Sequence, residues 1–289
     1  MVLNKLKIIL EMIKFEHTIF ALPFAYVGMI LGTMETYNHL PSMKQFFWVT
    51  MAMVGARSAA MALNRLIDRT IDKTNPRTAN RAIPAGKLNI KEVMFFVIGS
   101  FILLFISAWQ LSDLAFRLFP VAVLFLVFYS YTKRFTWACH YILGVSIGLA
   151  PLGAWVAVTN EITYPALVLF LTVALWIAGF DILYATQDLD IDKENGLFSI
   201  PSRFGLKKAL LIARITHGLT VLGLFYLFFI TGLGIWYIIG AVIANFILHY
   251  EHSIISANDM SRLNTVFFTM NGILSVIVFI FTLIDLVVK

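Results

Sequence analysis

Nine apolar runs dominate this 289-residue chain and restrict what it can fold into. Each run has about 17–25 residues, which is enough for one helix to cross a hydrocarbon core about 30 Å thick. The composition agrees, because 60% of the residues are hydrophobic and only 13% are charged, whereas soluble domains contain about 25% charged residues. The sequence therefore predicts an all-α integral membrane protein in a lipid bilayer. The runs lie near 18–33, 42–63, 92–112, 115–131, 137–159, 164–187, 208–231, 233–250 and 265–288.

The run at 115–131 is the weakest of the nine, because it contains Arg117 and Pro120. We therefore expect nine transmembrane helices, or eight if this run does not cross the membrane. No soluble domain or low-complexity linker separates the runs, so residues 1–289 are expected to form a single domain. No small-residue cleavage site follows the basic N-terminus, which argues against a signal peptide. Cys139 is the only cysteine, so neither a disulfide framework nor a cysteine metal site is expected.

Basic residues are distributed unevenly between the two ends of the predicted helices. With nine spans, one side receives the N-terminus and the loops near 64–91, 132–136, 188–207 and 251–264, which together hold 17 of the 22 Lys and Arg residues. Cytoplasmic loops carry an excess of Lys and Arg, so this side is predicted to be cytoplasmic. Topology explains on which side the basic loops lie, but not why acidic residues share these loops. No nucleic-acid partner is expected.

Asn64, Asp68 and Asp72 form a first ladder of polar residues at the end of the second apolar run. Residues four apart lie on one face of a helix, about 6 Å from each other along the axis. Two unpaired carboxylates about 6 Å apart repel by roughly 3 kcal/mol at an effective dielectric constant of about 20. The first ladder therefore predicts a bound positive partner, unless it is simply a solvated helix end.

Asp181, Asp188 and Asp192 form a second ladder at the end of the sixth run. Their spacings of seven and four residues place them on one helix face with Tyr184 beside them, whereas Asp190 points elsewhere. Asp181 lies inside the apolar run, where an ionised carboxylate costs about 2.5–3.5 kcal/mol on insertion scales. Such a residue indicates a functional site.

Together the two ladders predict a site for Mg²⁺ and a diphosphate. Facing each other across a cavity, they would supply hard oxygen ligands, which suit a Mg²⁺ ion that also contacts substrate phosphates. Arg77, Arg81 and Lys133 could then neutralise the oxygens of a leaving diphosphate. Gaps between membrane helices would admit an isoprenoid tail, and aromatic rings could stabilise an allylic cation. His249 and His252 stand three apart, but without a partner they are interpreted as an ordinary loop pair.

These residues resemble a known family, the UbiA-type membrane prenyltransferases, over essentially the whole chain. The family pattern NDxxDxxxD corresponds to residues 64–72, and a stretch similar to RTANRPxxxG corresponds to residues 77–86. A YxxxK element appears as Tyr129 and Lys133, and the second acidic motif follows at residues 181–192. Four ordered elements make the resemblance specific. It implies a bundle of about nine transmembrane helices around a central cavity, in the inner membrane of a bacterium.

The resemblance also implies a role for each motif residue. Arg57, inside the second run, would hold the carboxylate of an aromatic acceptor, unless it forms an internal salt bridge to an aspartate. Tyr129 and Tyr184 would flank the allylic cation or the acceptor ring. No residue is identified as the base that removes the ring proton. Two Mg²⁺ ions that bridge the diphosphate would be bound by Asn64, Asp68, Asp72, Asp181 and Asp188, with Asp192 beside them. The diphosphate itself would be contacted by Arg77, Arg81 and Lys133. The predicted substrate-binding residues are Arg57, Asn64, Arg77, Arg81, Lys133, Tyr184 and Asp192, and the predicted catalytic residues are Asp68, Asp72, Asp188, Lys133 and Tyr129.

The chain departs from the family pattern in two places. Arg65 replaces the usual Asp of the Asn-Asp pair, and its spacing predicts that it points away from the first ladder. The first span opens with Phe15, Glu16 and His17 rather than a basic-Asp-Lys-Pro sequence. The local sequences at residues 64–68, 75–79 and 180–185 are similar to those of family members that prenylate 4-hydroxybenzoate in ubiquinone biosynthesis. The predicted function is Mg²⁺-dependent transfer of a polyprenyl group from polyprenyl diphosphate to such an aromatic acid, or alternatively to 1,4-dihydroxy-6-naphthoate in menaquinone biosynthesis.

An ion-coupled secondary transporter is the alternative from a different class of protein. The ionisable residues of such transporters lie near the midplane of the membrane, often at broken helices. Here they gather at predicted helix ends on one side, which favours an enzyme. The sequence leaves the polyprenyl chain length and the oligomeric state open.

Overall fold

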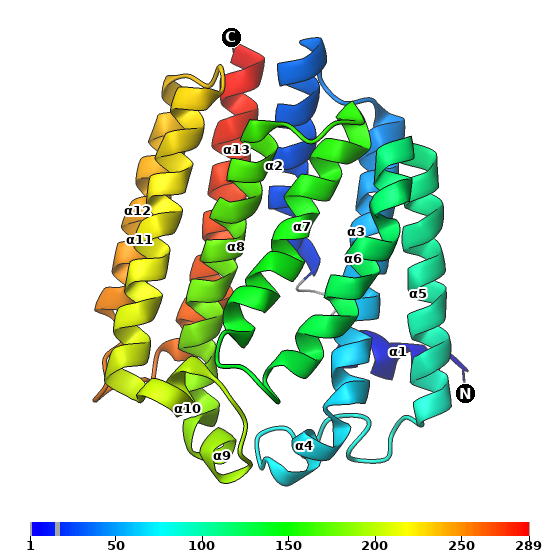
Figure 1. Ribbon diagram of the computed structural model, residues 1–289, viewed down its shortest axis with the longest axis vertical. Helices are drawn as coiled ribbons and strands as arrows, with labels where there is room; N and C mark the ends of the chain where they lie inside the picture. Colours follow the sequence, from blue (N-terminus) through cyan, green and yellow to red (C-terminus); the bar gives the residue numbers. More distant parts are fainter. Residues whose placement is uncertain (1, 15–17, 289) are drawn as a thin grey trace.

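The computed structural model describes residues 2–14 and 18–288, so the divergent opening at residues 15–17 lies outside the described part. Within that part nine helices of 18 or more residues run roughly along the long axis of the molecule (Figure 1). The described residues form no β-strand beyond one isolated bridge between Ser256 and Asp259. The long helices are α2 (Thr18–Tyr37), α3 (Met43–Ile67), α5 (Ile90–Leu111), α6 (Asp113–Thr132), α7 (Cys139–Thr159), α8 (Tyr164–Ala185), α11 (Leu206–Ile230), α12 (Ile235–Ser253) and α13 (Asn271–Val288).

Short helices α4, α9 and α10 lie together at the end of the bundle opposite the C-terminus, and α1 crosses the bundle near the same end (Figure 1). Each of α4 and α9 directly continues a long helix, α3 and α8 respectively, after a break at a ladder residue. This end of the bundle therefore carries both acidic ladders. The bounds of the short elements are α1 (Val2–Met12), α4 (Arg69–Thr74), a 3₁₀ turn at Thr186–Asp188, α9 (Leu189–Glu194) and α10 (Ile200–Phe204).

Seven of the described helical segments are long and apolar enough to cross a membrane. They are α3, α5, α6, α7, α8 with its continuation to Glu194, α11, and α13 with a π-helical turn at Thr265–Met270 before it. The predicted all-α membrane fold is thus confirmed. The weakest run forms α6 without a break, although Pro120 lies inside that helix. Because α2 and α12 are not among the seven, the count of nine spans stays a prediction.

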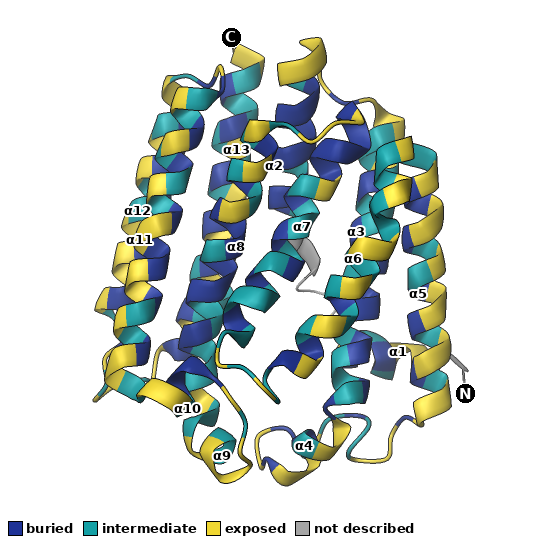
Figure 2. Cartoon of the chain, viewed as in Figure 1, coloured by how far each residue is buried: buried dark blue, intermediate teal, exposed yellow. Residues whose placement is uncertain are grey.

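Exposed residues lie on the outer faces of the long helices (Figure 2). Many of these exposed residues are large and apolar. Phe95 on α5 is 73% exposed and Phe229 on α11 is 75% exposed. Such exposure would be unfavourable in water, because burying a large apolar side chain gains about 1.5–3 kcal/mol. The outer faces are therefore suited to lipid tails.

Glycines allow two of the helix pairs around the cavity to approach closely. A Cβ atom at Gly28 of α2 would lie 2.2 Å from the carbonyl oxygen of Pro151 on α7. A Cβ atom at Gly144 of α7 would likewise lie 2.2 Å from the carbonyl oxygen of Ala174 on α8. Small residues drive helix packing in membranes because they let backbones come together. These contacts hold α7 between α2 and α8.

The interpretation of His249 and His252 as a loop pair without a partner was wrong. Both lie in α12, and His252 is buried with its Nε2 3.0 Å from Nδ1 of His217 on α11. The carboxylate of Glu251, which is also buried, lies 3.7 Å from the same nitrogen of His217. The partner could not be found from the local spacing, because it comes from a different helix.

Asp285 on α13 holds the start of α12 in place. Its buried carboxylate accepts hydrogen bonds from the backbone N–H groups of Gly234 at 2.6 Å and Trp236 at 3.0 Å. We expect Asp285→Ala to lower the free energy of unfolding by about 1–3 kcal/mol, because backbone donors at the start of α12, among them the N–H of buried Tyr237, lose their acceptor. Thermal unfolding in detergent, followed by circular dichroism, measures the shift. Replacing the exposed Glu161 by alanine is the control, and an equal midpoint for both variants would contradict the assignment.

Candidate active site

A cavity of about 1040 Å³ opens among the helices where α4 and α9 begin. Its charged lining comes from the ends of α3 and α8 and from the segments that follow them. Its apolar lining comes from the middle of α2, α7 and α8, for example Phe24, Ile147 and Val173. The cavity therefore combines a strongly polar end with an apolar interior, which suits an amphiphilic ligand.

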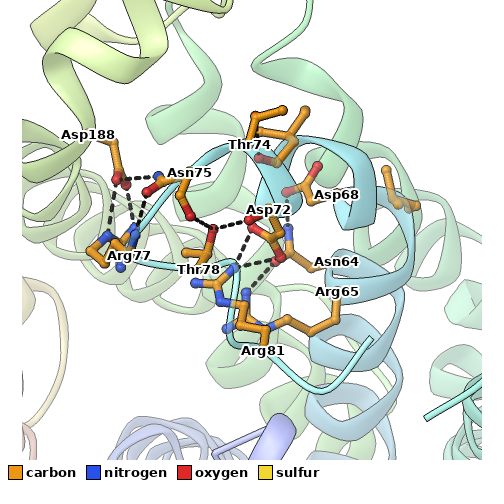
Figure 3. A network of polar contacts seen from close by, with 12 residues as sticks. Asn64, Arg65, Asp68, Asp72, Thr74, Asn75, Arg77, Thr78, Arg81 and Asp188 are labelled. Atoms are coloured by element: carbon orange, nitrogen blue, oxygen red, sulfur yellow. Dashed lines mark hydrogen bonds and ion pairs between the residues drawn. The ribbon is translucent and has the colours of Figure 1, made fainter. Parts of the chain in front are cut away.

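The first ladder keeps its spacing although α3 ends inside it. Helix α3 stops at Ile67 and α4 starts at Arg69. The backbone N–H of Asp68 nevertheless donates to the carbonyl of Asn64 at 2.9 Å, and that of Asp72 donates to Asp68 at 2.7 Å. All three side chains line the cavity, and Asn64 Nδ2 donates to Asp68 Oδ2 at 3.1 Å. The structure thus brings these three predicted residues together (Figure 3).

Basic side chains of the chain itself neutralise the first ladder. Lys133 Nζ lies 2.6 Å from Asp68 Oδ2, and Arg134 Nη2 lies 2.9 Å from Asp68 Oδ1. Arg81 Nη1 contacts both carboxylate oxygens of Asp72, at 2.7 and 2.9 Å. Both aspartates are buried, and a buried charge has to be paired. The positive partner that the ladder requires is therefore present within the protein.

The second ladder also lines the cavity, but on a broken helix rather than on one continuous face. A 3₁₀ turn at Thr186–Asp188 separates α8 from α9. Asp181 Oδ2 lies 2.7 Å from His140 Nδ1, and Asp192 Oδ2 accepts a hydrogen bond from the Ser199 hydroxyl at 3.0 Å. Asp190 is exposed and lies outside the cavity lining, as its spacing predicts.

Arg77 and Asn75 connect the segment after the first ladder to Asp188 in the second (Figure 3). Arg77 forms an ion pair with Asp188 through two nitrogens, and Asn75 Nδ2 donates to Asp188 Oδ1 at 2.9 Å. Partial burial lowers the pKa of Arg77, but the hydrogen bonds and charge of Asp188 outweigh it and raise this pKa above its usual value. Arg77 is therefore a permanent cation at the junction of the two ladders.

Two tyrosines and Arg57 line the cavity as predicted. The Tyr129 hydroxyl donates to the backbone carbonyl of Ala60 at 3.0 Å, which fixes the ring against α3. Tyr184 stacks on Phe267 with ring centroids 4.0 Å apart, and the Arg77 guanidinium lies 5.5 Å from the Tyr184 centroid. An aromatic wall thus adjoins the charged end of the cavity.

The prediction that Arg65 points away from the first ladder was wrong. Arg65 lines the cavity, and its Nη1 donates to Asn64 Oδ1 at 3.0 Å (Figure 3). A long arginine side chain can bend back beside its neighbour, so helical spacing alone does not fix where its guanidinium lies. Arg65 thus occupies the amide oxygen that the sequence assigned to Mg²⁺.

Sequence reasoning missed two residues of the site, Arg134 and His140. Arg134 bridges Asp68 Oδ1 and the carbonyls of Ile67 and Ser130. In the sequence, Arg134 is only a basic neighbour of Lys133, without a role in the site. His140 is 3% exposed, lines the cavity and contacts Asp181. His140 lies in an apolar run of the sequence, and an ionisable residue in such a run indicates a functional site. This position is the signal that could have identified it.

The donor set suits Mg²⁺ by its chemistry, because the ladders provide carboxylate and amide oxygens. The described part of the chain contains no group of three or more acidic, His or Cys side chains arranged to hold a metal ion. Asp68, Asp72 and Asp188 instead contact Lys133, Arg81 and Arg77. Binding of Mg²⁺ would therefore require these cations to leave the carboxylates, and substrate phosphates would be their natural new partners.

Comparison with known proteins identifies the family of the chain. Residues 21–273 match the model of the UbiA prenyltransferase family. The chain belongs to this family. A UbiA homologue from Aeropyrum pernix K1, whose apo structure is solved, is 30% identical; the alignment covers 93% of this chain and 98% of that one with a TM-score of 0.83. A UbiA homologue from Archaeoglobus fulgidus bound to DMAPP and Mg²⁺ is 18% identical with a TM-score of 0.74, and shows the shared fold.

Two bacterial relatives in the UbiA family carry the name 4-hydroxybenzoate octaprenyltransferase. The protein of Vesicomyosocius okutanii is 28% identical over 219 residues, which are 76% of this chain and 80% of the relative. The protein of Tolumonas auensis is 31% identical over 186 residues, which are 64% of this chain and 65% of the relative. The predicted family, its membrane-embedded helical fold and the class of prenyltransferase enzymes are thereby confirmed.

Proposed function

We propose that this UbiA family member transfers a polyprenyl group from polyprenyl diphosphate to the ring of an aromatic acid such as 4-hydroxybenzoate, with Mg²⁺ as cofactor. The observation that carries this proposal is the single cavity in which two acidic ladders and their basic partners adjoin an apolar interior. The names of the two bacterial relatives support the acceptor. The ligands of the Archaeoglobus homologue support the donor and the metal.

At the polar end, oxygens of Asn64, Asp68, Asp72, Asp181 and Asp188 would hold Mg²⁺, with Asp192 beside them. Bound Mg²⁺ would neutralise the diphosphate and make it a better leaving group. Arg77, Arg81 and Lys133 would transfer their hydrogen bonds from aspartates to phosphate oxygens, which carry more charge as the diphosphate departs. The ion pairs seen between these residues would thus keep both the acids and the bases in place before substrate arrives.

The bond changes follow from this arrangement. The bond between C1 of the polyprenyl group and the bridging oxygen breaks, and its electron pair leaves with the diphosphate. An electron pair of the acceptor ring forms the new bond to C1, and the ring then releases a proton. The faces of Tyr184 and Tyr129 would stabilise the allylic cation, as aromatic rings attract cations. The apolar interior would hold the polyprenyl tail.

Arg57 would bind the carboxylate of the acceptor. It lies on α3 seven residues before Asn64, which is about 10 Å along the helix axis from the first ladder. We expect Arg57→Leu to raise the KM for 4-hydroxybenzoate by about tenfold or more, since hydrogen bonds to charged groups contribute about 1.5–3 kcal/mol. Initial rates at varied acceptor concentration test this. The KM for polyprenyl diphosphate should stay near its native value, and an equal rise in both constants would contradict the assignment.

The function is tested by the product. Purified protein in proteoliposomes, without any ion gradient, is given polyprenyl diphosphate with 4-hydroxybenzoate or with 1,4-dihydroxy-6-naphthoate, and products are identified by mass. Prenylated 4-hydroxybenzoate is expected. Product from the naphthoate alone would move the acceptor to the alternative in menaquinone biosynthesis, and no product from either would overturn the proposal. Formation of product without a gradient also excludes the transporter alternative.

We also propose that the end of the bundle with α4 and α9 faces the cytoplasm of a bacterial inner membrane. The basic loops at residues 64–91 and 188–207 lie at this end, in keeping with the positive-inside rule. In a Cys139→Ser background, Lys87→Cys should react with a membrane-impermeant maleimide in inverted vesicles only. Labelling in right-side-out vesicles would reverse the orientation.

A further inference from the structure

A buried histidine lies beside the second ladder, and the proposed chemistry does not use it. His140 is at the first turn of α7 and is 3% exposed. Its Nδ1 lies 2.7 Å from Asp181 Oδ2, and its Nε2 lies 3.2 Å from the backbone nitrogen of Ile200 at the start of α10. Both ring nitrogens therefore have a protein partner.

The contact with Ile200 determines which ring nitrogen carries a proton. A backbone N–H can only donate, so His140 Nε2 must accept with its lone pair. Nδ1 is then the ring nitrogen that donates, and its acceptor is Asp181 Oδ2. His140 has no proton or lone pair left for a substrate, so it is not a catalytic residue.

The partner of Asp181 differs in kind from the partners of three other ladder aspartates. Asp68, Asp72 and Asp188 contact Lys133, Arg81 and Arg77, which carry positive charge. Those ion pairs have to open if Mg²⁺ and a diphosphate bind. The His140 ring is also held by the Ile200 N–H, so its own N–H can stay on Asp181 throughout. Histidine N–H groups that orient a metal-binding carboxylate act in the same way as other outer partners of metal sites.

A short segment, residues 198–200, ties this contact to the rest of the site. The Ser199 hydroxyl donates to Asp192 Oδ2 at 3.0 Å, and the Phe198 N–H donates to the carbonyl of Lys133 at 2.8 Å. The Ile200 N–H holds His140. Three consecutive residues thus contact Asp192, the Lys133 backbone and, through His140, Asp181. The segment fixes the second ladder relative to the element that carries Lys133.

We propose that His140 is a positioning residue that holds Asp181 through a hydrogen bond and connects it to the 198–200 segment. The inference rests on the proposed function, in which Asp181 takes part in binding Mg²⁺ and diphosphate. In this proposal one imidazole holds one carboxylate of the site in position, while the ion pairs of the other ladder aspartates open.

Two substitutions of His140 separate positioning from other roles. In His140→Gln, the amide NH₂ can donate to Asp181 and the amide oxygen can accept from the Ile200 N–H, so both contacts are retained. In His140→Leu, both are lost. The exposed His249 on α12 lies outside the cavity lining, so His249→Leu is the matched control. Thermal unfolding in detergent confirms that each variant is folded.

The readout is calorimetric binding of Mg²⁺ together with a non-hydrolysable thiolodiphosphate analogue of geranyl diphosphate. Loss of an outer partner typically weakens metal affinity by 10–100-fold, so H140L should bind Mg²⁺ about tenfold or more weakly. H140Q should stay within about threefold of the native protein and keep its pH profile of prenyl transfer. Native binding by H140L, or an H140Q variant as defective as H140L, would overturn the proposal.

Failure of the proposed function gives a different pattern. If the acceptors tested are not substrates, the native protein forms no product, yet binding of Mg²⁺ and the analogue still reports on His140. If H140L does not fold, H140Q decides alone, because a role in proton transfer predicts lost activity and a positioning role predicts retained activity.

Discussion

Asp188→Asn is expected to reduce product formation by about 10²–10³-fold, the range seen when one preorganised electrostatic contact to a transition state is removed. Asp188 belongs to the second ladder, and its carboxylate contacts Arg77 and Asn75 from the segment that follows the first ladder. Asparagine has the same shape but no charge. It would leave the cation of Arg77 in place while removing a carboxylate that is proposed to bind Mg²⁺. Initial rates in proteoliposomes at saturating Mg²⁺ and polyprenyl diphosphate measure the loss.

Asp190 provides the matched control, two residues further along the same acidic segment. It is exposed and does not line the cavity. Asp190→Asn changes the net charge by the same amount and should keep a rate within about twofold of native, as surface substitutions usually have small effects. If the two variants had equal rates, the assignment of Asp188 to the metal site would be wrong.

The fold and the place of the site could be predicted because both depend on periodic signals. Apolar runs of membrane-spanning length appear as helices α3, α5, α6, α7, α8, α11 and α13. The four-residue spacing of Asn64, Asp68 and Asp72 predicts one shared cavity wall, and the spacing of the second ladder predicts that Asp190 lies outside the cavity. These inferences need only the rise and twist of a helix.

The partners of the ladder residues could not be predicted, because they come from distant parts of the chain. His140 meets Asp181 across 41 residues, and Arg134 meets Asp68 across 66 residues. Long side chains add a second source of error, since Arg65 bends back to Asn64 against its helical phase. The break of α8 at the 3₁₀ turn Thr186–Asp188 contains no glycine or proline that would predict it. Contacts between distant residues therefore determine which charges are paired, although the sequence shows where the charged residues lie along the chain.

Arg81→Leu is expected to produce the largest loss of stability in the site. Arg81 contacts both oxygens of Asp72, whose side chain is 6% exposed, while the Arg81 side chain is 26% exposed. Breaking a buried pair costs about 3–5 kcal/mol because the remaining charge is left uncompensated. The partial exposure of Arg81 places the expected loss near the lower end, at about 3 kcal/mol. Thermal unfolding in detergent should show it, together with loss of prenyl transfer.

A double variant then separates the structural role of this pair from its role in the reaction. In Asp72→Asn with Arg81→Leu, no buried charge is left alone, so most of the lost stability should return. Prenyl transfer should remain at least 10²-fold below native, because both the carboxylate and the guanidinium proposed to contact Mg²⁺ and diphosphate are gone. If Asp72 and Arg81 served stability alone, activity would return together with the unfolding midpoint. A stable and active double variant would therefore remove this pair from the proposed site, whereas a stable but inactive one would tie it to the transfer itself.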